Sequence, residues 1–305
     1  MPVAQCRTAV RRLYARFGTR NSETLWRKLM RTLWHLTLTA DGRQALFPTE
    51  ALLRRALRIL AETVGSRTLL FCIVDDHIHD VVCCSRSEAG RLGQSLNLAL
   101  RPIASVPFNR RTDIRPVENR HHLERLVGYL LTQAQHHGLP GHPGLWSGSC
   151  FADLVGARVI KALGLPILEF LPRLRLTAVA ETVGLHLPTA DGEDRGVCGA
   201  GAARIAAAAS AALAVDPLLA GNSCAVVQAR AAASVLAARA GIATRETASA
   251  LGVSMRTTQR LALGVHDEKL LSAVRLRLAL EDMVAEGSGT VLSAASTRCS
   301  RGLGQ

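Results

Sequence analysis

The chain has 305 residues, enough for about two domains, and its 48% hydrophobic content allows a sizeable buried core. A formal net charge of +13 favours nucleic acid or an anionic surface as the partner, unless an arginine-rich composition bias explains the charge. The 8 cysteines form no C-x-x-C pair, and the chain shows neither a signal peptide nor a membrane-spanning stretch, so zinc-binding, secreted and membrane proteins are disfavoured.

The first part of the chain predicts alternating helices and strands. Residues 5–32 indicate a basic helical arm that either lies along DNA or is a solvated helical face. Alternating residues then predict a strand that ends at an Asp41-Gly42 turn, and leucines at helical spacing predict an amphipathic helix. A continuous apolar run predicts a buried strand. The expected elements are a strand over 34–39, a helix over 48–64, a buried strand over 69–74 and a strand over 77–84.

The last two strands form either a hairpin or one long bent strand. A helix follows with Ser87 as its expected N-cap. The order strand, helix, strand, strand, helix, strand, helix favours an α+β fold, in which an antiparallel sheet has helices packed on one side. We expect the strand over 77–84 inside this sheet. The further elements are a helix over 87–104, an edge strand or arm over 108–117 and a helix over 119–137.

Two pairs of polar residues stand at spacings that place each pair on one face. The strand over 77–84 begins with His77-Ile78-His79. Because side chains alternate across a strand, both imidazoles point to one face and can bind one metal ion. Tyr129 and Gln133 lie four residues apart in a helical segment, so they also share a face.

Together these residue types point to the cleavage and rejoining of single-stranded DNA. His77, His79 and Gln133 are neutral ligands that would leave Mg²⁺ or Mn²⁺ its full charge, and a phosphate would supply a hard oxygen. Tyr129 would attack the phosphorus, and the phosphotyrosine would allow a second strand end to be joined without ATP. An H-x-H triplet often occurs by chance, and a tyrosine in a helix is usually a packing residue. The prediction therefore depends on the two patterns occurring together in one chain.

Other basic side chains near these residues are expected to contact DNA. The arginines of the segment over 108–117 are expected to bind phosphates. Histidines around the tyrosine helix are expected to face DNA or solvent, with a fourth metal ligand or a proton relay as the alternative. The arginines are Arg110, Arg111 and Arg115, and the histidines are His121, His122, His136 and His137.

The second half of the chain predicts helices only. Helices are expected over 202–215 and 225–240, followed by a helix-turn-helix over 244–263 in which Thr244 and Ser254 cap the two helices. The exposed face of its second helix carries residue types that read DNA grooves, namely Arg256, Gln259 and Arg260. Two ordinary helices of an alanine-rich bundle are the alternative.

These motifs resemble a known family over residues 33–157. Asp76-His77-Ile78-His79 resembles the HUH motif of single-tyrosine transposases, and Tyr129 with Gln133 resembles their nucleophile and third metal ligand. Residues 129–156 are similar to the REP-associated tyrosine transposases, which carry a Y-x-x-x-N, a "GL" and a later "W-S-S" in that order. Here the matching segments are His137-Gly138-Leu139 and Leu145-Trp146-Ser147-Gly148-Ser149. Residues 229–261 resemble the helix-turn-helix of the replication initiator DnaA.

The resemblance implies a ferredoxin-like sheet, dependence on Mg²⁺ or Mn²⁺, and a 5′-phosphotyrosine formed on single-stranded DNA. It also implies recognition of a hairpin beside a short guide sequence. Gln133 stands where the REP-associated branch has Asn, and Ala134 where it has Pro. These departures leave the substrate sequence and the branch open.

The leading hypothesis is a metal-dependent single-stranded DNA endonuclease and strand transferase, a transposase. It would work in the cytoplasm at the nucleoid, without a membrane partner, and whether it forms a homodimer stays open. The alternatives are a non-catalytic DNA-binding regulator and a relaxase or replication initiator. The expected organisation is a basic arm over 1–32, an HUH domain over 33–157, a helical connector and linker over 158–201, a helical domain over 202–285 and a disordered tail over 286–305.

Overall fold

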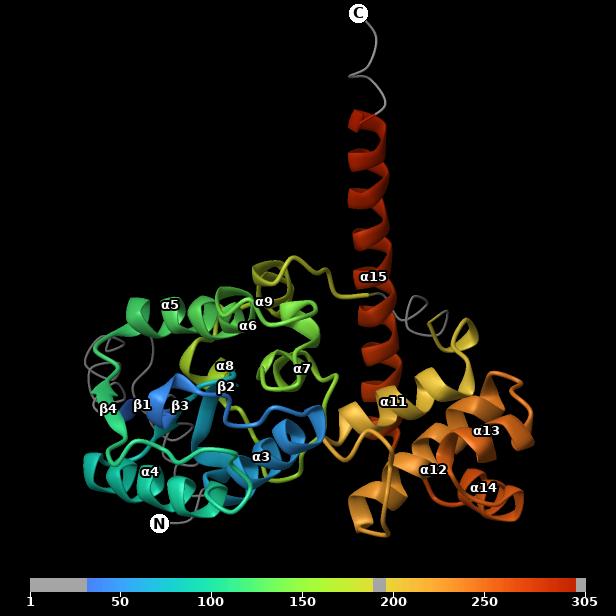
Figure 1. Ribbon diagram of the computed structural model, residues 1–305, viewed down its shortest axis with the longest axis horizontal. Coiled ribbons are helices and arrows are strands. Elements are labelled where there is room, and N and C mark those ends of the chain that lie inside the picture. The colour runs from blue at the N-terminus through green and yellow to red at the C-terminus, as the bar shows by residue number, and fades with distance from the viewer. Residues whose placement is uncertain (1–31, 189–195, 300–305) are drawn as a thin grey trace, which may run out of the picture.

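The computed structural model describes residues 32–188 and 196–299. A sheet-containing half and an all-helical half lie side by side, and one long helix runs upward between them (Figure 1). The expected arm over 5–32 lies outside the described residues, apart from its last residue. Most buried apolar side chains of each half form a separate cluster, and Ala214 and Leu280 of the helical half join the first cluster.

The first half contains a four-stranded antiparallel sheet with the strand order β2-β3-β1-β4. Strands β2 and β3 pair as a hairpin, which settles the choice between a hairpin and one bent strand. Because β3 pairs with β1 on one side and β2 on the other, the histidine strand lies inside the sheet as expected. The strands are β1 (Leu33–Thr39), β2 (Thr68–Ile73), β3 (His77–Cys83) and β4 (Asp113–Pro116).

Two helices connect these strands and cover one face of the sheet. With α3 (Glu50–Thr63) and α4 (Arg86–Leu100), the chain follows the order β-α-β-β-α-β, which is that of ferredoxin-like folds. Helices α5 (Arg120–Leu131) and α6 (Gln133–His136) lie on the opposite face (Figure 1). The expectation that all helices pack on one side is therefore wrong for α5 and α6.

The two faces differ because side chains alternate along each strand. Leu36, Leu38 and Ile78 share one face and are fully buried. His35 and His79 point to the other face, where α5 lies. Both faces of the sheet are thus covered, and the histidines lie on the face that α5 covers.

The N-cap of helix α4 lies two residues earlier than predicted. Its N-cap is Ser85, whose side chain accepts a hydrogen bond from the backbone of Glu88, while Glu88 bonds back to the backbone of Ser85. This reciprocal arrangement satisfies two free donors at the helix end and outcompetes Ser87 as the start. The prediction of Ser87 as the cap is wrong for this reason.

The segment that follows α6 packs against the free edge of β2. The indole of Trp146 donates to the carbonyl of Ile73 at 2.8 Å, and Ile73 donates to the carbonyl of Gly148 at 2.8 Å. A Cβ on Gly148 would collide with the Ile73 carbonyl oxygen, so the approach requires glycine. The segment thereby fixes the end of β2 just before the turn that leads into the histidine strand.

Short helices after this segment complete the first core. Ile167, Phe170 and Val179 are buried in the same cluster as the sheet, so this part of the expected helical connector packs into the first core. The short elements of the first half are the 3-10 turns η2 (Asp41–Arg43), η3 (Gly65–Arg67) and η4 (Pro143–Leu145), with helices α7 (Phe151–Val155), α8 (Ile167–Phe170) and α9 (Leu176–Thr182).

The second half is all helical, as predicted. Its core consists largely of alanine, leucine and valine side chains. Helix α13 begins at Thr244, but its N-cap position is Ala243 and makes no side-chain bond, so the prediction of Thr244 as the cap is wrong. The helices are α11 (Ala202–Ala212), α12 (Cys224–Arg239), α13 (Thr244–Leu251), α14 (Met255–Ala262) and α15 (Glu268–Cys299).

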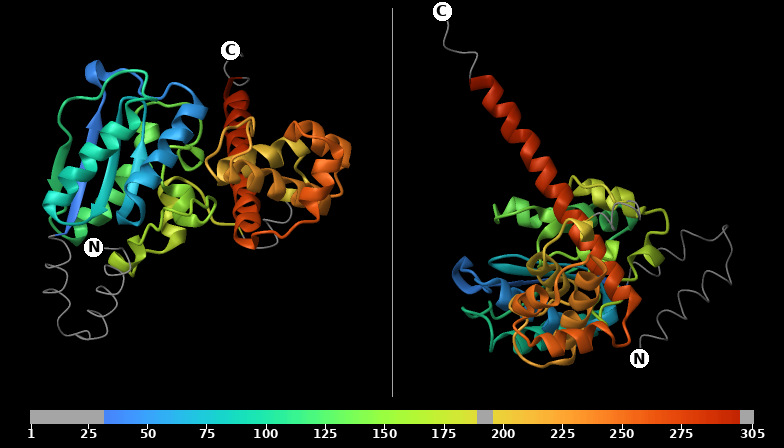
Figure 2. Two further views of the ribbon diagram at one scale, coloured as in Figure 1. Left: turned by 90° about the horizontal axis from the view of Figure 1, so that it is seen from below. Right: turned by 90° about the vertical axis from the view of Figure 1, so that its right-hand side faces the viewer.

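Helix α15 replaces most of the expected disordered tail. It continues to Cys299 and extends well beyond the rest of the helical half (Figure 2). Helix formation is limited by nucleation, and the packed first part of α15 supplies the nucleus to which the Gly- and Ser-containing residues add. None of the helices in the described ranges is long and apolar enough to cross a membrane.

Buried hydrogen bonds join the two halves. Arg54, on α3, pairs with Glu50 at 2.6 Å and donates to the Ser210 hydroxyl at 2.8 Å and to the Val215 carbonyl at 3.1 Å. The backbone of Val159 donates to the carbonyl of Ala212 at 2.7 Å. Because a buried guanidinium needs partners for its charge and its donors, these contacts hold the halves in one arrangement.

Candidate active site

The histidine motif presents two ring nitrogens to each other on the α5 face of the sheet. His77 Nε2 and His79 Nε2 lie 2.8 Å apart. Each ring is held through its other nitrogen. His77 Nδ1 lies 2.6 Å from Asp76 Oδ1, and His79 Nδ1 lies 3.0 Å from His35 Nε2. Thr37 adds a hydroxyl 3.3 Å from the same nitrogen of His79.

These contacts limit which ring nitrogens of His77 and His79 can carry a proton. If both Nδ1 atoms carry protons and donate to Asp76 and His35, both Nε2 lone pairs face each other at 2.8 Å. Two lone pairs repel at this distance unless a cation lies at them. A metal ion bound to both nitrogens satisfies this arrangement, and in its absence a neutral His79 tautomer with its proton on Nε2 satisfies the contacts as well.

Burial keeps two of these imidazoles neutral. It lowers the pKa of His79 to about 2, with further lowering by the charge of His77. It also lowers the pKa of His35 to about 4, with the charge of His122 acting in the same direction. A neutral imidazole has the lone pair that a metal ligand requires, so the donor set fits a divalent metal ion.

Tyr129 and Gln133 complete the group from the end of α5 and the start of α6. The Tyr129 side chain is 45% exposed, and its ring centroid lies 5.5 Å from that of His79. Gln133 is 3% exposed and donates from Nε2 to the Tyr129 carbonyl at 3.2 Å. Its side chain also favours the charged form of His79, which places the carboxamide beside that ring. The structure therefore brings together all four residues selected from the sequence.

A second set of ligand atoms adjoins the first. Asp76, His77 and His137 offer one atom each within 4.8 Å of one another and could hold a metal ion. His137 Nδ1 lies 2.8 Å from Asp75 Oδ1 and 3.7 Å from Asp76 Oδ1. His137 is thus tied to the turn before β3, in contrast to the expectation that it is solvated or faces DNA. The side chain of His121 is 90% exposed, as expected.

Sequence reasoning did not select His35, Thr37 or Asp76 as site residues. Asp76 adjoins the motif, and its position before His77 was the available signal. His35 and Thr37 alternate on β1, and the pairing of Thr37 with His79 brings them to the site. Without the register of β1 against β3 this placement cannot be read from the chain.

The predicted phosphate-binding arginines are exposed but differ in position. Arg115 pairs in register with His35 and therefore shares the face of the sheet that carries the histidines. It also forms an exposed ion pair with Asp113 at 2.7 Å. Arg110 and Arg111 precede β4 and lie at the surface. Arg115 is thus the member of this group that the sheet directs toward the site.

The predicted helix-turn-helix has the local geometry that its sequence indicated. Gly252 adopts a left-handed conformation at the turn, and Ser254 caps α14 by accepting from the backbone of Thr257 at 3.1 Å. Arg256, Gln259 and Arg260 are exposed on α14, while Thr258 is buried. These three exposed side chains lie far along the chain from the histidine site and belong to the other half.

Comparison with known proteins gives one weak likeness. No protein-family model and no curated protein matches the sequence. A solved structure of a REP-associated tyrosine transposase bound to a REP hairpin is similar to 41% of this chain and 79% of its own, with 16% identity and a TM-score of 0.33. At this TM-score the likeness does not bear on the function of the chain.

Proposed function

We propose that the chain is a metal-dependent single-stranded DNA endonuclease and strand transferase that acts through a 5′-phosphotyrosine at Tyr129. The observation that carries the proposal is the pair of Nε2 atoms 2.8 Å apart on His77 and His79, with Tyr129 and the buried Gln133 beside them. His77, His79 and Gln133 would hold Mg²⁺ or Mn²⁺. A bound ion would withdraw negative charge from a phosphate oxygen and so make the phosphorus easier to attack.

Two features of the Tyr129 side chain support such an attack. It is exposed enough to meet DNA, and its ring rests against His79. Its oxygen would form a bond to phosphorus, the bond from phosphorus to the 3′ oxygen would break, and that oxygen would leave as a hydroxyl after taking up a proton. The phenol must lose its proton in this step. Attack by another 3′ hydroxyl would reverse the reaction and release the tyrosine.

The finer assignment is part of the same proposal. We assign residues 33–157 to the HUH single-tyrosine transposases, and the hairpin substrate follows from the resemblance to their REP-associated branch. The ferredoxin-like strand order and the H-x-H triplet on the inner strand β3 support this assignment. The proposed partner is single-stranded DNA that forms a hairpin.

A covalent-trapping assay tests the function. The full chain is incubated with a pool of labelled single-stranded hairpin DNA and Mn²⁺, and the product is denatured and separated by size. We expect a labelled protein–DNA adduct that is absent when a chelator is added first. If no adduct forms on any hairpin although the hairpins bind, the proposed chemistry is wrong and the regulator becomes the better account.

A second candidate function is duplex DNA binding through the helix-turn-helix. The exposed arginines of α14, the capped start of that helix and the left-handed turn glycine favour it. A regulator that only binds DNA has no need for the histidine pair and Tyr129, so we place duplex binding beside the catalytic function.

Replacing Arg256 and Arg260 with alanine should weaken duplex binding without changing adduct formation on single strands. Each arginine that contacts a phosphate contributes about 0.9 to the slope of log affinity against log salt, so a loss of up to about 2 is expected. The measurement is a salt titration of duplex binding, and Arg239→Ala, which lies on α12, is the control. Unchanged duplex binding would show that α14 does not contact the DNA.

Replacing His35 with alanine should weaken metal binding because His79 loses the partner of its Nδ1. Outer-shell partners of this kind typically contribute 10-fold or more to metal affinity, so we expect a decrease of about 10-fold in affinity for Mn²⁺. His35→Gln, which keeps an acceptor, should restore part of it, and His121→Ala should have no effect. The readout is Mn²⁺ binding measured by electron paramagnetic resonance, and equal affinity in all variants would place the ion away from His79.

A further inference from the structure

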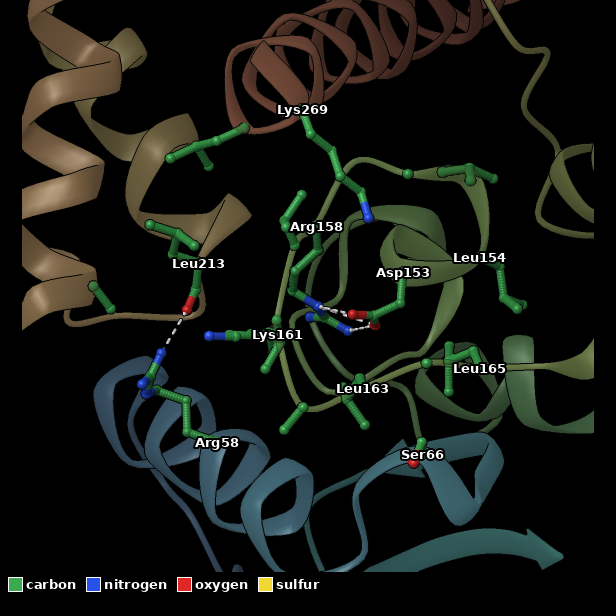
Figure 3. A pocket seen from close by; sticks show the side chains of 18 of the residues that line it. Arg58, Ser66, Asp153, Leu154, Arg158, Lys161, Leu163, Leu165, Leu213 and Lys269 are labelled. Atoms are coloured by element: carbon green, nitrogen blue, oxygen red, sulfur yellow. Dashed lines mark hydrogen bonds and ion pairs between the residues drawn. The ribbon is translucent and has the colours of Figure 1, made fainter. Parts of the chain in front are cut away.

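A large cavity lies between the two halves, away from the histidine site. Its volume is about 1220 Å³, which exceeds the range of 300–1,000 Å³ that is usual for small-molecule sites. Its walls come from α3, from the segment after α7 and from the starts of α12 and α15 (Figure 3). Leu154, Leu163 and Leu165 form apolar parts of the wall. Because elements of both halves line it, the cavity exists only in this arrangement of the halves.

Two of the three lysines in the chain line this cavity. Of the 37 basic residues 34 are arginine, and the lysines are Lys28, Lys161 and Lys269. Lys161 and Lys269 both belong to the lining, and Lys28 lies outside the described residues. In Figure 3 the Lys269 side chain reaches inward from the start of α15, and the Arg58 side chain points toward the carbonyl of Leu213. The cavity thus contains two of the few lysines in a chain whose other basic residues are arginines.

Most other charges of the lining already have partners. Arg158 forms a buried ion pair with Asp153. Arg58 donates to the Leu213 carbonyl at 3.2 Å and lies 3.9 Å from Glu62. Asp267 accepts a hydrogen bond from the backbone of Lys269 at 3.0 Å.

Among the side chains that the structure describes, within residues 32–188 and 196–286, none pairs with the ammonium groups of Lys161 and Lys269. These two are the cationic groups of the lining that remain available to a ligand. Within the described part of the chain, Asp267 is the lining carboxylate without a basic partner, and its single charge cannot offset two ammonium groups.

We propose that this cavity binds phosphate groups through Lys161 and Lys269. A lysine ammonium is a compact point charge with three donors and binds phosphate well, while the leucines of the wall suit the apolar faces of a sugar or base. The phosphates belong either to the backbone of a DNA strand or to a small phosphorylated ligand. The proposal does not depend on the chemistry of Tyr129, and the test below is read without DNA cleavage.

Amine acetylation followed by mass spectrometry tests the proposal in the intact chain. Only three lysines and the N-terminus can react, so each site is read separately. The reaction is run alone, with pyrophosphate and with a short single-stranded oligonucleotide. At a ligand concentration of ten times its Kd, the acetylation rates of Lys161 and Lys269 should fall about 10-fold.

The pattern of protection identifies the source of the phosphate. Protection of Lys161 and Lys269 by the oligonucleotide assigns the cavity to a DNA strand, and protection by pyrophosphate alone assigns it to a small phosphorylated ligand. Protection of neither lysine overturns the proposal. Equal protection of Lys28 by pyrophosphate also overturns it, because that result indicates general anion binding.

Charge-preserving variants separate a binding role from a structural one. The double substitution Lys161→Ala and Lys269→Ala should reduce the salt dependence of single-strand binding by about 1.4 in slope if DNA is the ligand, since each contact to a single strand contributes about 0.7. Lys161→Arg with Lys269→Arg should keep the slope, and Arg55→Ala, exposed on α3, is the matched control. The three variants could instead show the same salt slope although the oligonucleotide protects both lysines. The protection would then come from a conformational change, and the cavity would not be the DNA-binding site.

Discussion

Replacing Tyr129 with phenylalanine is expected to abolish covalent attachment of the protein to DNA and to leave the fold unchanged. The substitution removes one oxygen, which is the atom that would bond to phosphorus. Neither of the two histidines nor Gln133 can form a stable phosphodiester with the DNA. Adduct formation should therefore fall by at least about 1,000-fold, as for other nucleophile deletions. The measurement is adduct formation on labelled single-stranded hairpin DNA in the presence of Mn²⁺.

The exposure of Tyr129 means that the substitution should remove the nucleophile without disturbing the fold. The side chain is 45% exposed, so its hydroxyl is not needed to satisfy a buried group. Unchanged thermal unfolding and unchanged affinity for Mn²⁺ would show that the histidine pair is intact. Tyr14 is the other of the 2 tyrosines, and Tyr14→Phe is the matched control. An adduct that persists in Tyr129→Phe and disappears in Tyr14→Phe would move the nucleophile to the N-terminal arm.

Local patterns in the sequence were sufficient to predict the strand and the helix that carry the candidate site residues. The H-x-H triplet on an apolar strand and the four-residue spacing of Tyr129 and Gln133 are short-range signals, and the structure places these residues together. The helix-turn-helix also follows from local signals, namely a turn glycine at position 252 and a capping serine at position 254. Such signals work because helix caps and strand alternation depend on neighbouring residues.

The parts that could not be predicted depend on contacts between distant segments. His35 reaches His79 only because β1 pairs with β3 in one register, and a shift by one residue would turn it to the other face. The side of the sheet on which α5 packs is likewise a tertiary choice. The bonds from Arg54 to Ser210 and Val215 join segments that no local pattern connects. The cavity between the halves follows from that docking and has no sequence signal of its own.

Asp80 is a further residue whose environment only the structure reveals. It lies between His79 and Val81 on β3, and its side chain points to the apolar face, opposite Leu36 of β1 and Phe71 of β2. The residue is fully buried, and neither carboxylate oxygen has a hydrogen-bond partner in the described part of the chain. Thr68 lies close enough to stabilise the charged form slightly, but no hydrogen bond joins the two. An unpaired buried carboxyl is costly, so it provides a test of the fold.

Replacing Asp80 with valine should therefore stabilise the protein, and the gain should grow as the pH rises from about 4 to about 8. Burial raises the pKa of Asp80 from 3.8 to about 8. In that interval the unfolded chain has released the proton that the folded protein retains, so the free energy of unfolding of the wild type falls with rising pH. Each unit of pKa difference is worth about 1.4 kcal/mol, and allowing for relaxation of the interior we expect a gain of about 2–4 kcal/mol at neutral pH.

Urea unfolding of wild type and Asp80→Val across that interval is the measurement. The two curves of stability against pH should run parallel and closest together at the acidic end, where the carboxyl is protonated in both states, and separate toward the basic end. Asp41→Asn, at an exposed aspartate, should change stability by less than about 0.5 kcal/mol at any pH. A valine variant that is less stable than the wild type at neutral pH would mean that Asp80 has a partner in solution. The face of the sheet opposite the histidines would then be polar at its centre, and the packing of α3 and α4 against β3 would need revision.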